Sequence, residues 1–259
     1  MLMDYHIHTA MSGDAEGKFN ECIRIAHLRG LAEIGFSDHF HPKEPEYSMK
    51  YEKLPEYVEK VQLLKETDDF PVKLGIEVDF IPSLQSEIEK ITRREHFDYV
   101  IGSVHFINGW GFDNSKYISK YQEWDIAKLY ETYFSLVQQC ARSGLFDIIG
   151  HPDIIKKFGY KPEVDITNVF LNTIEVIKDC RVCVEVNTRG LMMPCREIYP
   201  SKEFLEICFD NEIPITLGSD AHKPEDVGKD FDQALELIRE AGYENIARFT
   251  RRKQELVEI

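Results

Sequence analysis

Histidine and carboxylate side chains stand close together near the amino terminus of this sequence, in a pattern that can bind a metal ion. His6 and His8 are two residues apart, so in an extended strand they lie on the same face as Asp4. A divalent ion would use both imidazole nitrogens, whereas a hydrogen-bonded structural pair explains this spacing equally well. Ligands elsewhere in the chain are therefore needed to choose between a metal site and a structural pair.

Residues of the same kinds recur where later apolar segments end. With the first two histidines they make nine potential ligands, the others being Asp14, His39, Glu77, His105, His151, Asp220 and His222. The remaining histidines, His27, His41 and His96, stand outside this pattern. Nine nitrogen and oxygen ligands are too many for one tetrahedral zinc ion and fit two or three ions, with Glu77 as a natural bridge because a carboxylate has two oxygens. Such mixed sites accept zinc, manganese or iron.

Alternating strands and helices must position these ligands. Apolar patterns predict strands over 3–9, 31–36, 72–80, 99–105, 146–152, 182–187 and 213–222, and helices over 16–29, 54–69, 83–94, 126–143, 164–178, 201–211 and 231–241. Seven β-then-α units of roughly 30 to 45 residues are typical of a parallel barrel. We therefore expect a single-domain (β/α)7 barrel over residues 1–259, with its strand-end side chains gathered on one face.

Three segments do not fit the repeating unit. Residues 41–53 are predicted to form a loop, and residues 248–253 a basic tail. The segment 106–123 is aromatic, contains glycine and is too long for a tight connection, so we expect it to fold over the site.

Composition argues against several classes of protein. The 259 residues are 43% apolar and carry a formal net charge of −15, which repels nucleic acid and anionic membranes at long range. The chain has no basic segment before an apolar run at its amino terminus and no stretch of about 18 apolar residues, so we expect a cytoplasmic protein. Six scattered cysteines predict reduced thiols, and no pattern specifies an oligomeric state.

The ordered set of motifs resembles the polymerase and histidinol phosphatase (PHP) superfamily, from residue 4 to about residue 225. The motifs are His6-Ile7-His8-Thr9 with Asp14, Ser37-Asp38-His39, Gly75-Ile76-Glu77, Gly102-Ser103-Val104-His105, Gly150-His151-Pro152 and Gly218-Ser219-Asp220-Ala221-His222. Within the superfamily the chain looks most like the stand-alone histidinol-phosphate phosphatases of histidine biosynthesis. The resemblance implies a distorted (β/α)7 barrel and a site for three metal ions.

The resemblance also implies how the ligands are shared among the ions. One ion would be held by His6, His8, Glu77 and Asp220, a second by Glu77, His105 and His151, and a third by Asp14, His39 and His222. Asp14 stands where many members of the superfamily have histidine, and a histidinol phosphatase accommodates this change. Glu77, Asp220 and His222 would then be catalytic residues.

Hydrolysis of a phosphate monoester is the chemistry that such a centre favours. The dianionic ester repels a nucleophile, and clustered divalent ions offset that charge and lower the pKa of bound water, so we predict in-line attack by a hydroxide held between two ions. Arg189, beyond the sixth strand, is the strongest candidate to bind the phosphate, followed by Arg196 and by Lys156 or Lys157, although each is also explained as a solvated loop charge.

The leaving group is less constrained by the motifs. Candidates to contact the amine and imidazole of L-histidinol phosphate are Asp79, Phe106, Trp110 and Glu185. A phosphotyrosine-protein phosphatase or a broad small-molecule phosphatase would use the same metal motifs, whereas a 3′–5′ exonuclease fits poorly with the acidic charge. A catalytically silent binding protein would have lost ligands, and all nine are present.

Overall fold

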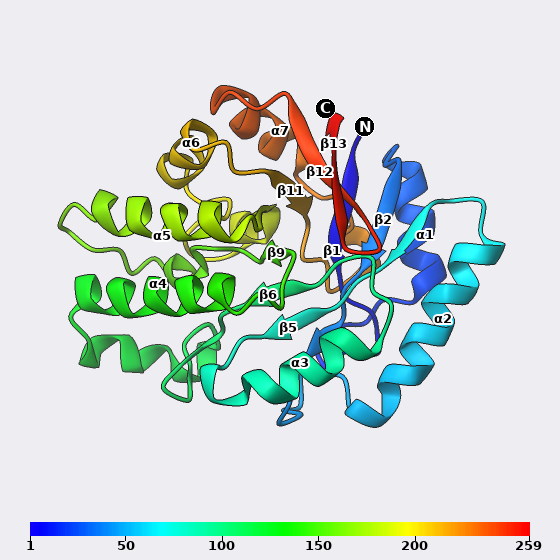
Figure 1. Ribbon diagram of the computed structural model, residues 1–259, viewed down its shortest axis with the longest axis horizontal. Coiled ribbons are helices and arrows are strands. Elements are labelled where there is room, and N and C mark those ends of the chain that lie inside the picture. The colour runs from blue at the N-terminus through cyan, green and yellow to red at the C-terminus, as the bar shows by residue number, and fades with distance from the viewer.

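The computed structural model describes residues 1–259, in which helices surround a central set of short strands (Figure 1). The strands that form the ring are β1 (Met3–Ile7), β2 (Glu33–Phe36), β3 (His39–Phe40), β4 (Val72–Leu74), β5 (Glu77–Asp79), β6 (Ile101–Ser103), β9 (Ile148–Ile149), β10 (Cys183–Asn187) and β11 (Ile215–Gly218). They form one sheet of order β1-β2-β4 and another of order β11-β10-β9-β6-β5-β3. A parallel bridge between Ile7 and Ala221 closes the ring, so the expected distorted (β/α)7 barrel is confirmed.

The distortion lies in the second and third predicted strands, each of which is interrupted. The second is present as β2 and continues, after a break of two residues, as β3 beyond its predicted end, and the third divides into β4 and β5. Beside these interrupted strands, the ring of Tyr99 fills the barrel interior, and its hydroxyl donates to the carbonyl of Tyr5 at 2.7 Å. A Cβ atom on Gly35 or Gly75 would lie 2.2 Å from atoms of Tyr99, so only glycine leaves space for this ring.

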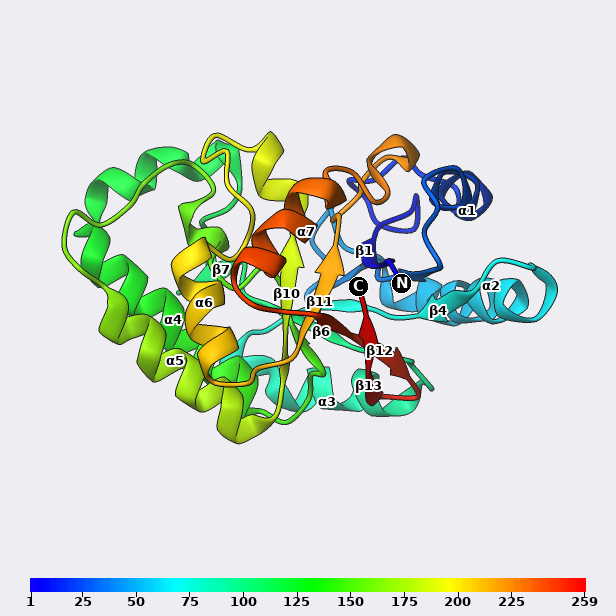
Figure 2. The same ribbon diagram turned by 90° about the horizontal axis from the view of Figure 1, so that it is seen from above.

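Seven α-helices surround the barrel, with α1 and α2 on one side and α4, α5 and α6 on the other (Figure 2). Their bounds are α1 (Phe19–Leu28), α2 (Leu54–Thr67), α3 (Gln85–Arg94), α4 (Ile126–Arg142), α5 (Thr167–Cys180), α6 (Lys202–Asp210) and α7 (Phe231–Glu240). Each of the predicted helices is present, with ends shifted by a few residues. Asp125 and Ser201 cap α4 and α6 by accepting hydrogen bonds from backbone N–H groups of the first turn.

The prediction of a basic tail at residues 248–253 is wrong, because this segment belongs to a hairpin. Antiparallel strands β12 (Asn245–Thr250) and β13 (Lys253–Glu258) lie at the amino-terminal ends of the barrel strands (Figure 2). Arg248 pairs with Glu33 at 2.8 Å, and Arg252 pairs with Asp147 at 2.8 Å. The basic residues therefore neutralise carboxylates at the closed end of the barrel.

Two long connections lie at the opposite end. The segment after β6 forms the small hairpin of β7 (Phe106–Ile107) and β8 (Trp110–Gly111), followed by a 3₁₀ helix over Ser115–Glu123. The connection after β3 ends in a 3₁₀ turn over Tyr51–Lys53. Residues of both connections line a cavity of about 760 Å³, so the 106–123 segment does fold over the site.

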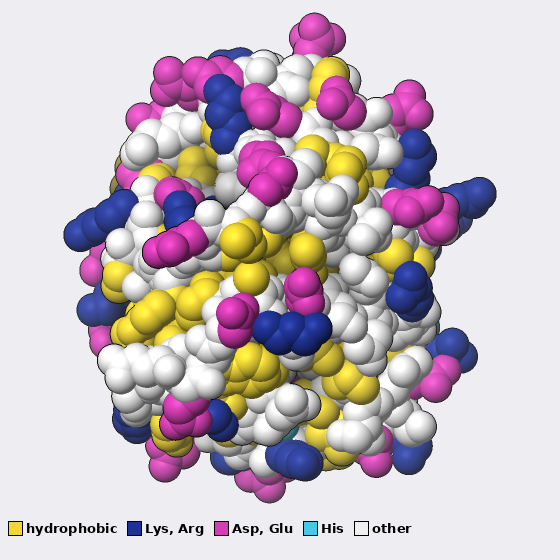
Figure 3. Space-filling model, turned by 90° about the vertical axis from the view of Figure 1, so that its left-hand side faces the viewer, with side chains coloured by type: hydrophobic (Ala, Val, Ile, Leu, Met, Phe, Trp, Pro, Cys, Tyr) yellow, Lys and Arg dark blue, Asp and Glu magenta, His cyan; other side chains and the backbone are white.

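The surface on the α4 and α5 side mixes acidic, basic and hydrophobic side chains without a continuous basic area (Figure 3). Val164 and Leu171 are among the large hydrophobic side chains that are exposed, at 60% and 44%. No helix is both long enough and apolar enough to cross a membrane.

Candidate metal centre and active site

The nine predicted ligands meet at the carboxyl-terminal end of the barrel strands. Seven of them are buried, His222 is half-buried and Asp14 is exposed. The side chains arrive from separate strands because all the barrel strands run parallel, so each strand end points to the same face. Residues as distant in sequence as His6 and Asp220 are thus brought together.

The first group of ligand atoms lies where β1, β5 and the end of β11 meet. Nε2 of His6 and Nε2 of His8 lie 3.3 and 3.6 Å from Oε2 of Glu77. Oδ1 of Asp220 is 3.3 Å from Nε2 of His8 and 3.9 Å from Nε2 of His6. Two imidazoles and two carboxylates therefore converge on one point.

The second group uses the other oxygen of Glu77. Oε1 of Glu77 is 3.0 Å from Nε2 of His151 and 3.8 Å from Nε2 of His105, and the two imidazole nitrogens are 3.3 Å apart. The hydroxyl of Ser103 donates to the same oxygen at 2.6 Å and holds the carboxylate in place. Glu77 thus lies between the first and second groups, as a bridging ligand would.

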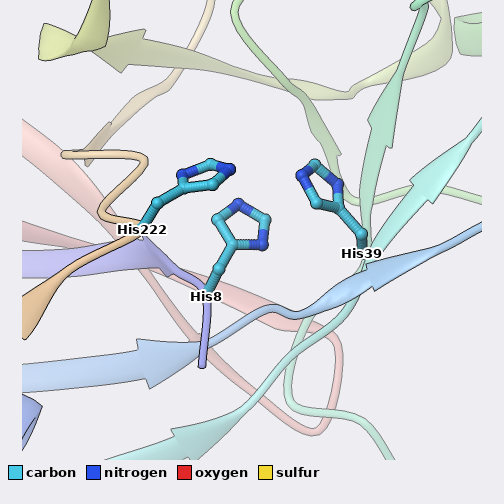
Figure 4. A group of neighbouring side chains, drawn as sticks. All are labelled: His8, His39 and His222. Carbon is cyan, nitrogen blue, oxygen red and sulfur yellow. The ribbon is translucent and has the colours of Figure 1, made fainter. Parts of the chain in front are cut away.

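The third group is the most open to solvent. Oδ2 of Asp14 lies 3.6 Å from Nε2 of His39 and 3.5 Å from Nε2 of His222. The rings of His8, His39 and His222 point toward one another from three different segments (Figure 4), and their ligand-type atoms lie within 4.8 Å of one another. His8 therefore stands between the first and third groups.

The donor atoms in this cluster fit divalent cations. Nε2 of His6 and both nitrogens of His8 are buried and lack hydrogen-bond partners, which is costly unless a cation coordinates them. Burial by itself lowers the pKa of His39, but the carboxylates of Glu77 and Asp14 outweigh it and raise that pKa to about 10. The carboxylates thus favour a positive charge at this position, which either a protonated imidazole or a bound cation can supply.

Two further carboxylates form hydrogen bonds to the predicted histidine ligands. Asp79 accepts a hydrogen bond from Nδ1 of His105 at 2.6 Å, and Glu185 bonds Nδ1 of His6 at 2.5 Å and the backbone N–H of His151 at 2.7 Å. Such partners fix the tautomer and direction of a ligating imidazole. Asp79 and Glu185 are therefore not free to contact a substrate, which corrects our expectation for both. From the sequence, the alternation of side chains along β10 predicts only that Glu185 points into the barrel.

Backbone strain marks two of the predicted ligands. His151 and Asp220 have φ angles of 25° and 51°, in the left-handed region that residues other than glycine rarely adopt. Each such residue is held at a cost of about 1–3 kcal/mol by the surrounding structure, and strain of this kind concentrates at functional sites.

A cavity of about 760 Å³ opens directly onto the cluster. Asp14, His39, His105, Asp220 and His222 form part of its wall. The side chains of Lys116, Lys157 and Arg189 bring positive charge to the cavity, and those of Glu46 and Asp113 bring negative charge. A phosphate group and a cationic group can thus be accommodated in one space.

Only some of the predicted substrate contacts line the cavity. Arg189 and Phe106 line it. Lys156 does not, because its buried Nζ bonds Asp153 and the carbonyl of Ile198, both at 2.8 Å. The 3₁₀ turn at this point sends the next residue, Lys157, into the cavity instead.

Arg196 and Trp110 also lie outside the cavity. The exposed Arg196 donates to the carbonyl of Leu191, and Trp110 is buried against Tyr121 and Trp124.

Tyr47 was not predicted from the sequence, yet it lines the cavity and bonds Asp79 at 2.6 Å. Its position in a loop without regular periodicity left no sequence signal.

This fold and site define a metal-dependent phosphoesterase type of barrel, and the comparisons with known proteins agree. The PHP domain model matches residues 4–189, so the chain belongs to the PHP domain family. A protein of Deinococcus radiodurans described as a probable histidinol-phosphatase is 38% identical over 98% of both chains. The histidinol-phosphatase of Lactococcus lactis is 27% identical over 96% of this chain and 94% of that protein.

Solved structures share the fold. The histidinol phosphate phosphatase of Lactococcus lactis, solved with zinc, L-histidinol and phosphate, superimposes with a TM-score of 0.85 at 24% identity over 98% of both chains. A structure from Listeria monocytogenes described as a histidinol phosphatase gives a TM-score of 0.80 at 21% identity, over 89% of this chain and 99% of that chain.

Proposed function

We propose that this protein is a metal-dependent phosphomonoesterase that hydrolyses L-histidinol phosphate to L-histidinol and phosphate. The observation that carries the proposal is the cluster of nine nitrogen and oxygen ligands, five of which line a cavity that also holds Arg189 and Lys157. The similarity of the whole chain to the Deinococcus radiodurans protein supports the choice of substrate.

Two or three divalent ions, zinc, manganese or iron, would be held by the three groups of ligands. His6, His8, Glu77 and Asp220 would hold the first, Glu77, His105 and His151 the second, and Asp14, His39 and His222 the third. Bound ions would offset the charge of the phosphate and lower the pKa of water. Glu77 would keep the first two ions adjacent because its oxygens face different groups.

The remaining charges of the cavity would orient the substrate. Arg189 lies 3.3 Å from Asp226 and Lys157 lies 3.3 Å from Asp113, so each cation is held at the wall without being fully enclosed. We assign both to the phosphate oxygens, since charge-assisted hydrogen bonds from guanidinium and ammonium groups suit phosphate. Glu46 would attract the protonated amine of the leaving group from the outer wall.

The test is phosphate release from a panel of monoesters by protein reconstituted with zinc, manganese or iron. We expect the highest kcat/KM for L-histidinol phosphate, compared with phosphotyrosine and small sugar phosphates, and no nucleotide release from single-stranded DNA. A clear preference for another ester would replace the substrate but keep the metal chemistry. Full activity of Glu77→Ala would reject the metal chemistry as well.

A further inference from the structure

Tyr47 is connected to the second group of ligands by a chain of hydrogen bonds. Its hydroxyl donates to Oδ2 of Asp79 at 2.6 Å, and Oδ1 of Asp79 accepts from Nδ1 of His105 at 2.6 Å. Because the carboxylate can only accept, Nδ1 of His105 carries a proton. Nε2 faces His151, 3.3 Å away, and is the nitrogen at which an ion would bind, in place of any second proton.

The same tyrosine touches the third group of ligands in two further ways. Its ring packs edge-on against the ring of His39, with centroids 5.3 Å apart. Its carbonyl accepts the backbone N–H of Gly13 at 2.8 Å, immediately before Asp14. A Cβ atom on Gly13 would lie 1.8 Å from the carbonyl oxygen of Glu46, so this close approach of the two loops requires glycine.

Hydrogen bonds made by the residues that follow Tyr47 fix the position of its loop. The backbone N–H of Met49 donates to the carbonyl of His39 at 2.9 Å, and the backbone N–H of His41 donates to the hydroxyl of Ser48 at 2.9 Å. The loop thus folds back onto the strand that carries one of the ligands. Tyr47 is held at the cavity wall by its own backbone as well as by its side chain.

We propose that Tyr47 is a positioning residue that orients His105 through Asp79 and, through Gly13 and His39, holds the third group of ligands beside the second. The inference rests on the proposed metal centre. Tyr47 contacts the ligand sets of two ions and itself supplies no ligand. Its loss therefore weakens ion binding at the His105 position first, whereas a tyrosine that only filled space would affect stability alone.

The experiment measures zinc per chain in zinc buffers of decreasing free concentration, followed by elemental analysis. His105→Ala identifies which binding step belongs to the second group, because that step is lost. In Tyr47→Phe we expect the same step to be weakened by about 10-fold, with kcat/KM lowered in parallel. The matched control is Tyr57→Phe, which removes another tyrosine hydroxyl bond, to the carbonyl of Gly75 at 2.8 Å, without touching a ligand.

The outcomes separate this inference from the proposed function. If the wild-type chain binds no ion, the metal centre itself is rejected. If the wild type binds zinc and Tyr47→Phe binds it equally well at every step, the positioning role is rejected. Gly13→Ala provides a second variant that leaves the hydroxyl intact: we expect it to weaken the step assigned to Asp14, and retention of that step would reject the link between the two loops.

Discussion

The two ends of the barrel bury similar carboxylates but neutralise them differently. At the amino-terminal end, Glu33 pairs with Arg248 and Asp98 pairs with Lys65 at 2.7 Å, so the chain supplies the cations. At the carboxyl-terminal end, Glu77 and Asp220 face imidazoles, several of whose nitrogens have no partner. Where the chain completes its own ion pairs the carboxylates are neutralised internally, and where it leaves them incomplete we predict a cation-binding site.

The hairpin of β12 and β13 explains why only one end is open. It covers the amino-terminal ends of the strands and places Phe249 in the core, with its backbone N–H donating to the hydroxyl of Tyr5 at 3.3 Å. No equivalent element covers the other end, where connecting loops instead surround a cavity of about 760 Å³. Substitutions at the open end should therefore change activity far more than substitutions at the closed end.

Glu77→Ala should have the largest effect. It removes the oxygens shared by the first two groups, so we expect kcat/KM to fall by roughly 1,000-fold or more and the content of bound metal to fall. The metal-free variant should also unfold at a lower temperature than the metal-free wild type, because Oε2 of Glu77 lies 2.6 Å from Nδ1 of His39 and its loss leaves that buried imidazole without its carboxylate. Elemental analysis measures the metal content, and a wild-type metal content in Glu77→Ala would contradict the bridging role.

Arg189→Met should have the next largest effect, about 10- to 100-fold in kcat/KM, since a cation that lines the cavity is lost. Arg196→Met is the matched control, because Arg196 is exposed and bonds only the carbonyl of Leu191. Its kcat/KM should stay within about twofold of the wild type. Equal effects of the two substitutions in steady-state kinetics would remove Arg189 from the proposed phosphate site.

Metal affinity should depend on pH at the open end. Burial by itself lowers the pKa of His105, but Asp79 and Asp113 raise it to about 9, and the pKa of His39 is raised to about 10. Both imidazoles are therefore positively charged near neutral pH without metal, and an ion must displace one proton from each ring. We expect apparent zinc affinity to rise by roughly 10-fold or more per pH unit between about pH 6 and 8 and to level off above the pKa values. Competition with a chelator measures this, and a constant affinity would contradict it.

Glu33→Gln should have the smallest effect on catalysis. Its carboxylate is 1% exposed and its partner Arg248 is 34% exposed, so we expect a loss of about 2 kcal/mol in the free energy of unfolding, less than for a fully buried pair. Metal content and kcat/KM should not change. Chemical denaturation measures the loss, and a decrease in metal content would mean that the two ends are coupled.

Much of the site was predictable because strand periodicity and parallel topology together place strand-end residues on one face. His6 and His8 share a face for this reason, and Glu77 belongs with them although it lies 69 positions after His8 in the chain. The choice between Lys156 and Lys157 was not predictable, since neighbouring residues in a 3₁₀ turn point in different directions. The roles of Asp79 and Glu185 were not predictable either, because they depend on which imidazole each carboxylate contacts in the folded chain.

The sequence by itself determined the order of strands and helices, the barrel and the set of ligand-type side chains, because these follow from local periodicity and residue chemistry. Tertiary structure alone decided three features: the basic residues near Arg248 close the barrel, Lys156 is internal, and Tyr47 reaches Asp79. Each of these depends on contacts between segments far apart in the chain, and no local pattern encodes the distance between such segments.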